Sequence, residues 1–572
     1  MILVFLNWLY ISILALIIGL SINKVIKGLF HYVINDWAMV WLNGIMALTV
    51  YAQYFSLIYR MGTISNIVLC LLSGGLAYWM RNELRDLFEN VKRSIKINKK
   101  MMMMALIFIA IVCFFEIITN QKANHADTDG YHVQAIRWIE DYGVVKGIGN
   151  LYNRLAYNSA FMCLQALFSW RFLFGVSMHA MNGYLCCGFF LIVLYDLLFA
   201  GQKSYILTFF RIMIMVYIVY PSNLYDISSP NSDMMTMLFV GFILYKWVSL
   251  LEEKEKNALP YALLSVIAVF TISLKLSAAI LPLLAIKPAI MLVKEKRWKD
   301  IAVLIGMGIL VIAPFLIRNV IISGYLLYPY SGIDLFNVDW KMPASMLDYD
   351  KYEIMVWGRC LRDVSLRNVP LTGWLPVWWE EQEMWLRITV IANVISIPLA
   401  IGVMIRKIRR KDWDTVHFVF CIIVLFFSWF LSAPLLRYGL IYTIILPITV
   451  MGVMLSEKNF STKQGSRILV SLCLTGCIIS GVFRLRDIQT INKFSHVAYN
   501  FWDCEGVSWE GIEVYIPYQM GNMGYYFIPS TQHDYVLPYI ELRGESIQDG
   551  IRVKEQYKNE RFESCGAISD WK

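Results

Sequence analysis

Apolar segments long enough to cross a bilayer recur along most of this chain. A transmembrane helix needs roughly 20 mainly apolar residues, and about fourteen segments approach that length. They are residues 3–22, 37–57, 63–80, 101–118, 178–199, 205–220, 233–251, 258–273, 276–293, 301–317, 385–405, 415–432, 436–455 and 468–483. Only 16% of the 572 residues are charged and 58% are hydrophobic, whereas about a quarter of the residues are charged in a soluble protein. The sequence therefore predicts a polytopic α-helical membrane protein.

Lysine and arginine are concentrated in alternate loops between these segments. The rich loops carry Lys24 and Lys27; Arg81, Arg85, Lys92, Arg93, Lys96, Lys99 and Lys100; Lys203; Lys254 and Lys256; Lys294, Lys296, Arg297 and Lys299; Arg406, Lys407, Arg409, Arg410 and Lys411; and Lys458, Lys463 and Arg467. The other loops carry chiefly Arg60, Lys275 and Arg437. Because cytoplasmic loops carry the excess of Lys and Arg, we expect the rich loops in the cytoplasm. The net charge of +9 then reflects orientation, and we expect no nucleic-acid partner.

The same orientation places three long segments outside the cell. They are residues 119–177, 318–384 and the tail 484–572. Within the first, we expect residues 133–143 and 153–170 to form helices at the membrane surface, with a further short span as the alternative for residues 153–170. The tail contains strand-like stretches, 511–517 and 535–542, broken by Pro and Gly, which predict a small α+β domain. Cys504 and Cys565 lie in this tail and would pair in an oxidising compartment.

Two carboxylates follow an apolar segment at the predicted outer surface. Asp127 and Asp129 stand directly before a stretch with helical spacing of apolar residues. Carboxylates at such a place are candidates for a general base, although they would also suit an ordinary loop. His125 and His132 bracket them, but without a third spaced ligand they predict no metal site.

Several charged residues interrupt or end the apolar segments. They are Asp226, Asp233, Lys275, Arg318 and Arg437. A charge at the centre of a bilayer costs about 2.5–3.5 kcal/mol, so each needs a reason. All of them fall at the predicted outer face, which suggests one shared cavity. The alternatives are that Arg318 or Arg437 reaches toward lipid headgroups and that Asp233 caps a helix.

Short motifs along the chain resemble those of a known enzyme class. They are residues 127–132, 134–143, 150–155, 274–278, 318–319, 323–329 and 433–439. They resemble GT-C-type membrane glycosyltransferases of bacterial surface-polysaccharide clusters, and more distantly protein O-mannosyltransferases and aminoarabinose lipid A transferases. The resemblance runs from about residue 101 to the end of the tail. It divides the chain into added N-terminal helices with a basic loop (1–100), a GT-C-like core (101–483) and the outer domain (484–572).

The resemblance implies a reaction and a set of roles. A polyprenyl-phosphate sugar would be the donor, a glycan or lipid the acceptor, and the outer face of the bacterial plasma membrane the location. Transfer would occur with inversion, without a cofactor, with Asp127 or Asp129 as the base. Substrate binding would involve Tyr131, His132, Arg154, Asp233, Lys275, Arg318 and Arg437, with Lys275, Arg318 and Arg437 on the phosphate.

The sequence departs from the family pattern at two places, and other functions suit the same setting. Thr128 separates the two acids, which are adjacent in the family, so either one could be the base. Leu435 and Leu436 stand where an acidic residue is expected. A flippase or transporter of lipid-linked glycans, an O-antigen-type polymerase and an inactive assembly scaffold are the alternatives. A transporter would favour internal repeats, and we find none.

Overall fold

A computed structural model describes most of the chain. It covers residues 1–492 except 95–97, 122, 124, 126, 201–203 and 458–461. Of the tail it describes 516–520, 523–528, 541–543 and positions 554, 556, 565, 566, 568 and 569. The statements below concern these residues.

The described chain is built almost entirely from helices. The longer ones are α1 (Ile2–Phe30), α2 (Trp37–Ile58), α3 (Thr63–Trp79), α4 (Arg81–Ser94), α5 (Lys99–Thr119), α9 (Met181–Phe199), α10 (Tyr205–Val219), α12 (Ser232–Glu252), α13 (Ala258–Leu274), α15 (Trp298–Ser323), α16 (Ala344–Gly358), α18 (Met384–Arg409), α19 (Trp413–Ser432), α20 (Leu436–Glu457) and α21 (Thr462–Asn492). The shorter ones are the π-helix η1 (Thr128–His132), α6 (Val133–Tyr142), α7 (Ala160–Phe168), α8 (Arg171–Phe174), α11 (Pro221–Asp226), α14 (Ile286–Lys294) and α17 (Leu371–Glu381). Single 3-10 turns are η2 (Ile148–Asn150), η3 (Asn153–Ala156), η4 (Leu276–Ala278), η5 (Leu281–Ala285) and η6 (Val364–Asn368).

All the segments expected to span the membrane form helices, but not all of these helices are long and apolar enough to cross it. Among the described residues, 10 helices are long and apolar enough to cross a membrane, or 11 if the bent pair α3–α4 is one span. This confirms a polytopic α-helical protein and reduces the expected count of about fourteen. Four helices were expected to be spans but are not among these 10, and they are α2, α3, α10 and α13. α10 and α13 have only 15 and 17 residues, and α3 reaches sufficient length only with α4, across a bend of 77°.

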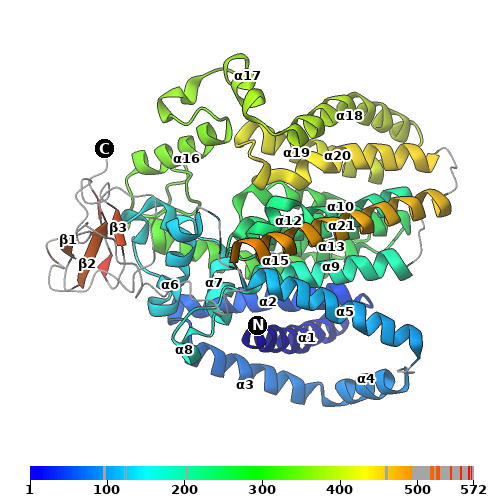
Figure 1. The fold of residues 1–572 in the computed structure, drawn as a ribbon, viewed down its shortest axis with the longest axis horizontal. Coiled ribbons are helices and arrows are strands. Elements are labelled where there is room, and N and C mark those ends of the chain that lie inside the picture. The colour runs from blue at the N-terminus through cyan, green and yellow to red at the C-terminus, as the bar shows by residue number, and fades with distance from the viewer. Residues whose placement is uncertain are drawn as a thin grey trace.

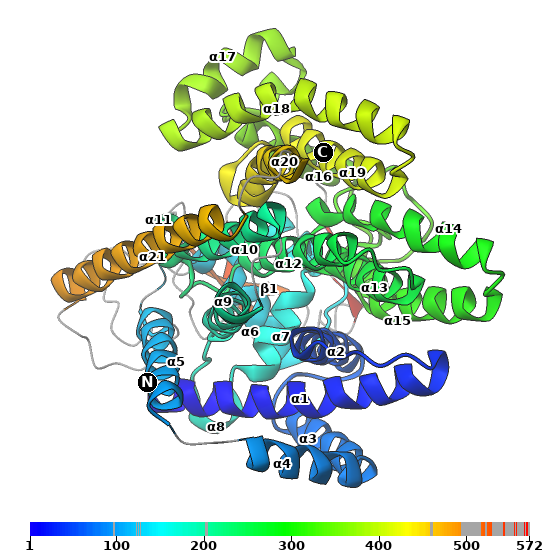
Figure 2. The same cartoon turned by 90° about the vertical axis from the view of Figure 1, so that its right-hand side faces the viewer.

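The helices run side by side, and their two ends differ in charge. In Figure 2, α1 to α4 lie along one side of the body and α17 to α20 along the opposite side. Contacts at the lysine-rich end are Lys24–Glu83 (2.7 Å), Lys246–Asp36 (2.7 Å) and Lys287–Asp414 (2.5 Å). At the other end, which carries α6, α7 and α16 (Figure 1), the backbone pairs are Met61–Ile139 (3.0 Å), Val144–Ser56 (2.9 Å) and Gly147–Ile321 (2.9 Å). The two predicted sets of loops thus lie at opposite ends of the body.

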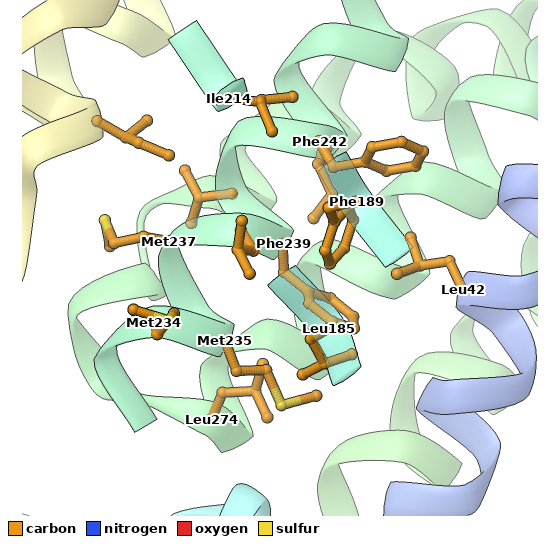
Figure 3. Packing of buried hydrophobic residues seen from close by; sticks show 14 of the residues in the cluster. Leu42, Leu185, Phe189, Ile214, Met234, Met235, Met237, Phe239, Phe242 and Leu274 are labelled. Atoms are coloured by element: carbon orange, nitrogen blue, oxygen red, sulfur yellow. The ribbon is translucent and has the colours of Figure 1, made fainter. Parts of the chain in front are cut away.

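The centre of the body is the helix α12. Its side chains are buried over most of its length, and Figure 3 shows Phe239 and Phe242 packed against Phe189 of α9. The ring centroids of Phe189 and Phe242 lie 5.3 Å apart, at an edge-to-face angle of 60°, which is a favoured aromatic geometry. Because other helices surround α12, the polar residues at its N-terminus lie inside the protein and do not face lipid.

The helices α1 and α2 approach one another closely at two glycines. A Cβ atom on Gly19 of α1 would overlap the carbonyl of Val40, and one on Gly44 of α2 would overlap the carbonyl of Ala15. Small residues at such positions let helix backbones touch, which is a common way to pack helices in membranes. The N-terminal helices are therefore firmly joined to each other.

We expected residues 153–170 to form a helix at the membrane surface, and this expectation is wrong about where the helix lies. Its helical part is α7, and all nine residues of α7 are buried. They pack against α2 and α6. The reason is composition: α7 is apolar on every side, so no face of it suits water, whereas Arg154 and Arg171 lie outside it.

The described part of the tail forms a small sheet. Its strands are β1 (Ile516–Met520), β2 (Met523–Ile528) and β3 (Glu541–Arg543), with β1 and β2 antiparallel and β2 and β3 parallel. The two expected strands overlap β1 and β3 by two residues each, and β2 was not expected. Near the C-terminus, Cys565 is buried and the Ser569 hydroxyl donates to Asn150 Oδ1 at 3.0 Å. Cys504 lies outside the described residues.

Candidate functional site

The loop that carries Asp127 is held in place by neutral hydrogen bonds. Asp127 directly precedes η1, and the buried Thr128 hydroxyl lies 2.7 Å from the hydroxyl of Ser229. The amide of Asn182 donates to the carbonyls of Ser229 (2.7 Å) and Asn231 (2.9 Å). The start of η1 is therefore fixed against the turn that leads into α12.

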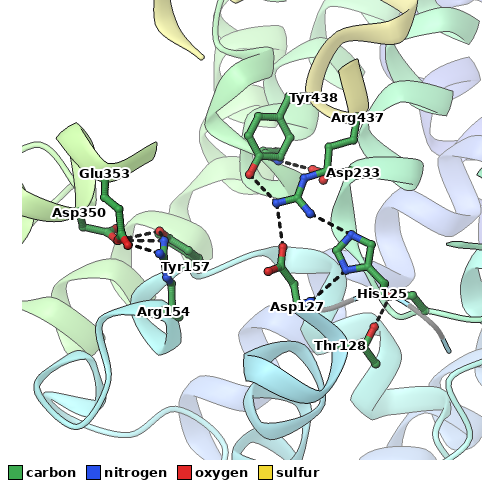
Figure 4. A network of polar contacts seen from close by, with 12 residues as sticks. His125, Asp127, Thr128, Arg154, Tyr157, Asp233, Asp350, Glu353, Arg437 and Tyr438 are labelled. Atoms are coloured by element: carbon green, nitrogen blue, oxygen red, sulfur yellow. Dashed lines mark hydrogen bonds and ion pairs between the residues drawn. The ribbon is translucent and has the colours of Figure 1, made fainter. Parts of the chain in front are cut away.

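Arg437 meets Asp127 at this point. Its Nη2 lies 2.9 Å from Asp127 Oδ2 and donates to the Tyr438 hydroxyl at 2.9 Å. Its Nη1 lies 3.0 Å from Nε2 of His125. Pro434 helps to end α19, and the Trp378 indole donates to the Pro434 carbonyl at 3.0 Å, which positions the start of α20. Figure 4 shows the guanidinium between the carboxylate, the imidazole and the phenol.

Lys275 and Asp233 form the second ion pair of the same group. Lys275 ends α13 in an extended conformation, and its Nζ pairs with the carboxylate of Asp233 in the first turn of α12. Nζ also lies 3.6 Å from the centroid of the Tyr438 ring, a cation–π distance. The N-cap of α12 is Asn231, so Asp233 is not the cap. Tyr438 therefore connects the two cations, and we call these five residues, Asp127, Asp233, Lys275, Arg437 and Tyr438, the outer cluster.

The pKa values of Asp127 and of Asp226, which lies beside the outer cluster, shift in opposite directions. Burial raises the pKa of Asp127, but the charge of Arg437, with smaller effects of His132 and His125, brings that pKa below its ordinary value overall. Burial raises the pKa of Asp226, and the nearby His125 and Arg437 only partly oppose it. Asp127 is thus ionised at neutral pH, whereas Asp226 holds its proton more firmly than a solvent-exposed aspartate.

His132 and Tyr131 form an aromatic wall beside the cluster. Their ring centroids are 4.3 Å apart, and Tyr131 lies 5.6 Å from Tyr157. His132 is 4% exposed, and burial lowers its pKa to about 3. Its imidazole is therefore neutral, so its charge cannot hold an anionic substrate at neutral pH.

Arg154 belongs to a neighbouring group that joins the two long loops. Its guanidinium pairs with Asp350 (3.2 Å) and Glu353 (2.7 Å) of α16. Asp350 also accepts hydrogen bonds from Tyr157 (2.8 Å) and Tyr328 (3.0 Å). Burial raises the pKa of Asp350, and Arg154 opposes this rise. We did not predict a role for Asp350 or Glu353 from the sequence. Their spacing of three residues would have placed both on one face of a helix.

Arg318 is not part of the outer cluster. It is 3% exposed, donates from Nε to Asn158 Oδ1 at 2.9 Å and bonds the hydroxyl of Ser56 in α2. The cavity beside it has a volume of about 30 Å³, which is room for about one water molecule. The expectation failed because α15 continues to Ser323, so Arg318 lies inside the helix rather than at its end.

Two further expectations concern Asp129 and metal binding. The side chain of Asp129 lies outside the described residues. Among the described residues, His, Cys, Asp and Glu side chains form no group of three or more that could hold a metal ion.

Comparison with known proteins gives a family. No curated protein and no solved structure matches the chain. A family model described as a domain of unknown function, DUF8201, matches residues 1–444. This range contains the outer cluster, the arginine-bearing loop before α7, and α16. Since it spans more than half of the chain, the protein belongs to the DUF8201 family.

Proposed function

We propose that the protein is a membrane glycosyltransferase that moves a sugar from a polyprenyl-phosphate donor to a glycan or lipid acceptor. The observation that carries the proposal is the ion pair of Asp127 and Arg437, from two distant parts of the chain, at 2.9 Å. It brings a candidate base and a candidate phosphate ligand together at the lysine-poor end of a multi-pass helical body.

The cations of the outer cluster suit a phosphate group. Arg437 and Lys275 have side chains that are 37% and 27% exposed, so both can be reached by a ligand. A guanidinium offers five N–H donors in a planar fork, which binds phosphate oxygens well. Lys275 adds a second positive charge, 3.6 Å from the centroid of the Tyr438 ring. Together they would stabilise the charge that develops on a departing phosphate.

Asp127 suits the role of general base. Because the charge of Arg437 lowers its pKa, the carboxylate is ionised at neutral pH and can accept a proton. A donor phosphate would compete for the guanidinium, which would free the carboxylate and raise its pKa toward the range that favours proton transfer. Binding of the donor would thus prepare the base.

The proposed step is a single displacement with inversion. The acceptor hydroxyl oxygen forms a bond to the anomeric carbon while its proton passes to Asp127. The bond from the anomeric carbon to the phosphate oxygen breaks, and the polyprenyl phosphate leaves with the electron pair. Arg437 and Lys275 hold that phosphate, while the paired Arg154 and Asp350 hold the second loop beside the site.

The proposed location is the outer face of a bacterial plasma membrane. The support is the distribution of charge, because loops that face the cytoplasm carry the excess of Lys and Arg. The outer cluster lies at the end of the body opposite the lysine-rich loops. A donor with its polyprenyl tail in the bilayer would present its phosphate at this depth.

The test is transfer by the purified protein in liposomes. A radiolabelled polyprenyl-phosphate sugar and extracted membrane acceptors are supplied, and the label is followed into the acceptor. Transfer of single sugars supports the proposal. Movement of the donor across the bilayer without transfer would instead identify a flippase, and joining of preassembled oligosaccharides would identify a polymerase.

A further inference from the structure

A second polar cavity lies at the other end of α6 from the outer cluster. Its volume is about 410 Å³, within the range of sites that bind small molecules. It is lined by the turn Tyr59–Ile64, by Glu140 and Asp141 of α6, and by Ser169, Arg171, Phe172 and Gly175. Since α6 has 10 residues, the cavity is separated from the outer cluster by about 15 Å of helix.

Two arginines supply positive charge to this cavity, although Arg171 also lies 3.8 Å from the carboxylate of Glu140. Arg171 pairs with Asp141, but its Nε is buried without a hydrogen-bond partner among the described residues. Arg60 lies over the ring of Tyr59 at 5.9 Å and forms no ion pair within the described part of the chain. The Arg171 side chain is 24% exposed and Arg60 is exposed, so both guanidinium groups can be reached by a ligand that accepts hydrogen bonds.

The acids of the cavity are already satisfied. Asp141 Oδ2 also accepts from Nε of Arg137 at 2.6 Å, so two arginines share its charge. The Ser177 hydroxyl lies 2.9 Å from each carboxylate oxygen of Glu140. Burial raises the pKa of Glu140 to about 7, which reduces its negative charge at neutral pH. The positive charge therefore remains available to an anion.

Apolar residues in the segments that line the cavity, or directly beside the lining residues in sequence, are exposed. They are Ile58 (86% exposed), Tyr59 (41%), Ile64 (50%), Leu173 (57%) and Phe174 (44%). They stand at the ends of apolar helices, where a multi-pass protein meets the boundary of the hydrocarbon. Apolar side chains exposed there face acyl chains, so the mouth of the cavity suits an amphiphilic ligand.

We propose that this cavity binds the phosphate headgroup of a membrane lipid. The phosphate oxygens would accept hydrogen bonds from Arg60 and from the partly exposed guanidinium of Arg171, and the acyl chains would lie along the exposed apolar residues. This lipid site is distinct from the outer cluster and does not depend on the proposed transfer reaction. α6 connects the two, with His132 next to its first turn and Glu140 near its last.

The test is lipid binding to the purified full-length protein, measured by native mass spectrometry. Dioleoyl phosphatidic acid is titrated in detergent, with dioleoyl phosphatidylcholine as the zwitterionic comparison. We expect one phosphatidic acid to bind preferentially. Arg60→Gln should weaken this binding about tenfold, the effect of losing one charge-assisted hydrogen bond. Because Arg60 is exposed, this variant should fold.

Two further variants and a competitor separate the site from general charge attraction. Thr63→Trp narrows the cavity without changing its charge and should also weaken binding, whereas Arg362→Gln removes an exposed arginine of the pair with Glu381 and should not. Equal binding by wild type and Arg60→Gln, or an equal loss with Arg362→Gln, would overturn the proposal. Displacement of the lipid by equimolar inorganic phosphate would show a site for free phosphate instead.

Discussion

The contact between Asp127 and Arg437 predicts a pH effect that a distant arginine would not have. Arg437 lowers the pKa of Asp127, so Arg437→Gln should raise that pKa. The acidic limb of the pH profile of kcat/KM reports the free-enzyme base, and we expect it to move to higher pH. KM for the polyprenyl-phosphate donor should also increase, because a phosphate ligand is lost.

The matched control for this change is Arg362→Gln, which alters an exposed arginine outside the outer cluster. Its pH profile and KM should equal those of the wild type. An unchanged acidic limb in Arg437→Gln would show that the guanidinium does not control the base. In that case the Arg437 side chain would contact lipid headgroups, which was the alternative that the sequence left open.

At the same scale, the sequence predicted that several of these charged residues would gather, but it wrongly included Arg318 and did not predict how the others would pair. Asp127, Lys275 and Arg437 were expected in one cavity because each is a charge at the same end of an apolar segment. The pairing of Lys275 with Asp233 and the position of Tyr438 depend on the rotation of α12, α13 and α20 about their axes. The residue pattern does not determine that rotation, because these helices are apolar on most sides.

Among the elements, the contact of α16 with the first long loop predicts a loss of stability. Asp350 is fully buried and is bonded by Arg154, Tyr157 and Tyr328. Asp350→Ala leaves the hydroxyls of Tyr157 and Tyr328 without this acceptor and leaves Arg154 paired with Glu353 alone, and a buried polar group that loses its partner costs about 1–3 kcal/mol. We expect a lower thermal midpoint in detergent, measured by tryptophan fluorescence.

Glu353→Gln provides the comparison for Asp350→Ala. The Glu353 side chain is 20% exposed, so its loss should cost about 1 kcal/mol or less. Equal thermal midpoints for Asp350→Ala and the wild type would mean that the two loops are not joined through this carboxylate.

Helix positions followed the hydropathy of the sequence closely, but helix ends and environments did not. Segment 301–317 became α15, which extends to Ser323, because Ile321 and Ile322 continue the apolar pattern beyond Arg318. Arg318 therefore lies within the helix, where its guanidinium contacts Asn158 and Ser56. α7 was assigned to the surface because Arg154 and Arg171 flank it, yet its own apolar residues bury it. The flanking charges therefore indicated neither the surroundings of α7 nor its start, which lies at Ala160 rather than at residue 153.

For the whole molecule, the orientation in the membrane can be measured directly. Asp363 after α16 and Arg410 after α18 are both exposed and belong to opposite ends. Cysteines placed there should react differently with a membrane-impermeant maleimide in intact cells. We expect labelling of Asp363→Cys above the wild-type background and none of Arg410→Cys until the cells are lysed. The reverse pattern would place the outer cluster in the cytoplasm.

The measurement that tests the central claim most directly is the rate of sugar transfer by Asp127→Asn. The amide keeps the size of the side chain but cannot accept the proton, and a general base contributes roughly 10²–10⁴-fold to the rate. We predict that the purified variant keeps the thermal midpoint of the wild type and transfers the labelled sugar at least about a hundredfold more slowly. Transfer at the wild-type rate by Asp127→Asn would contradict the account.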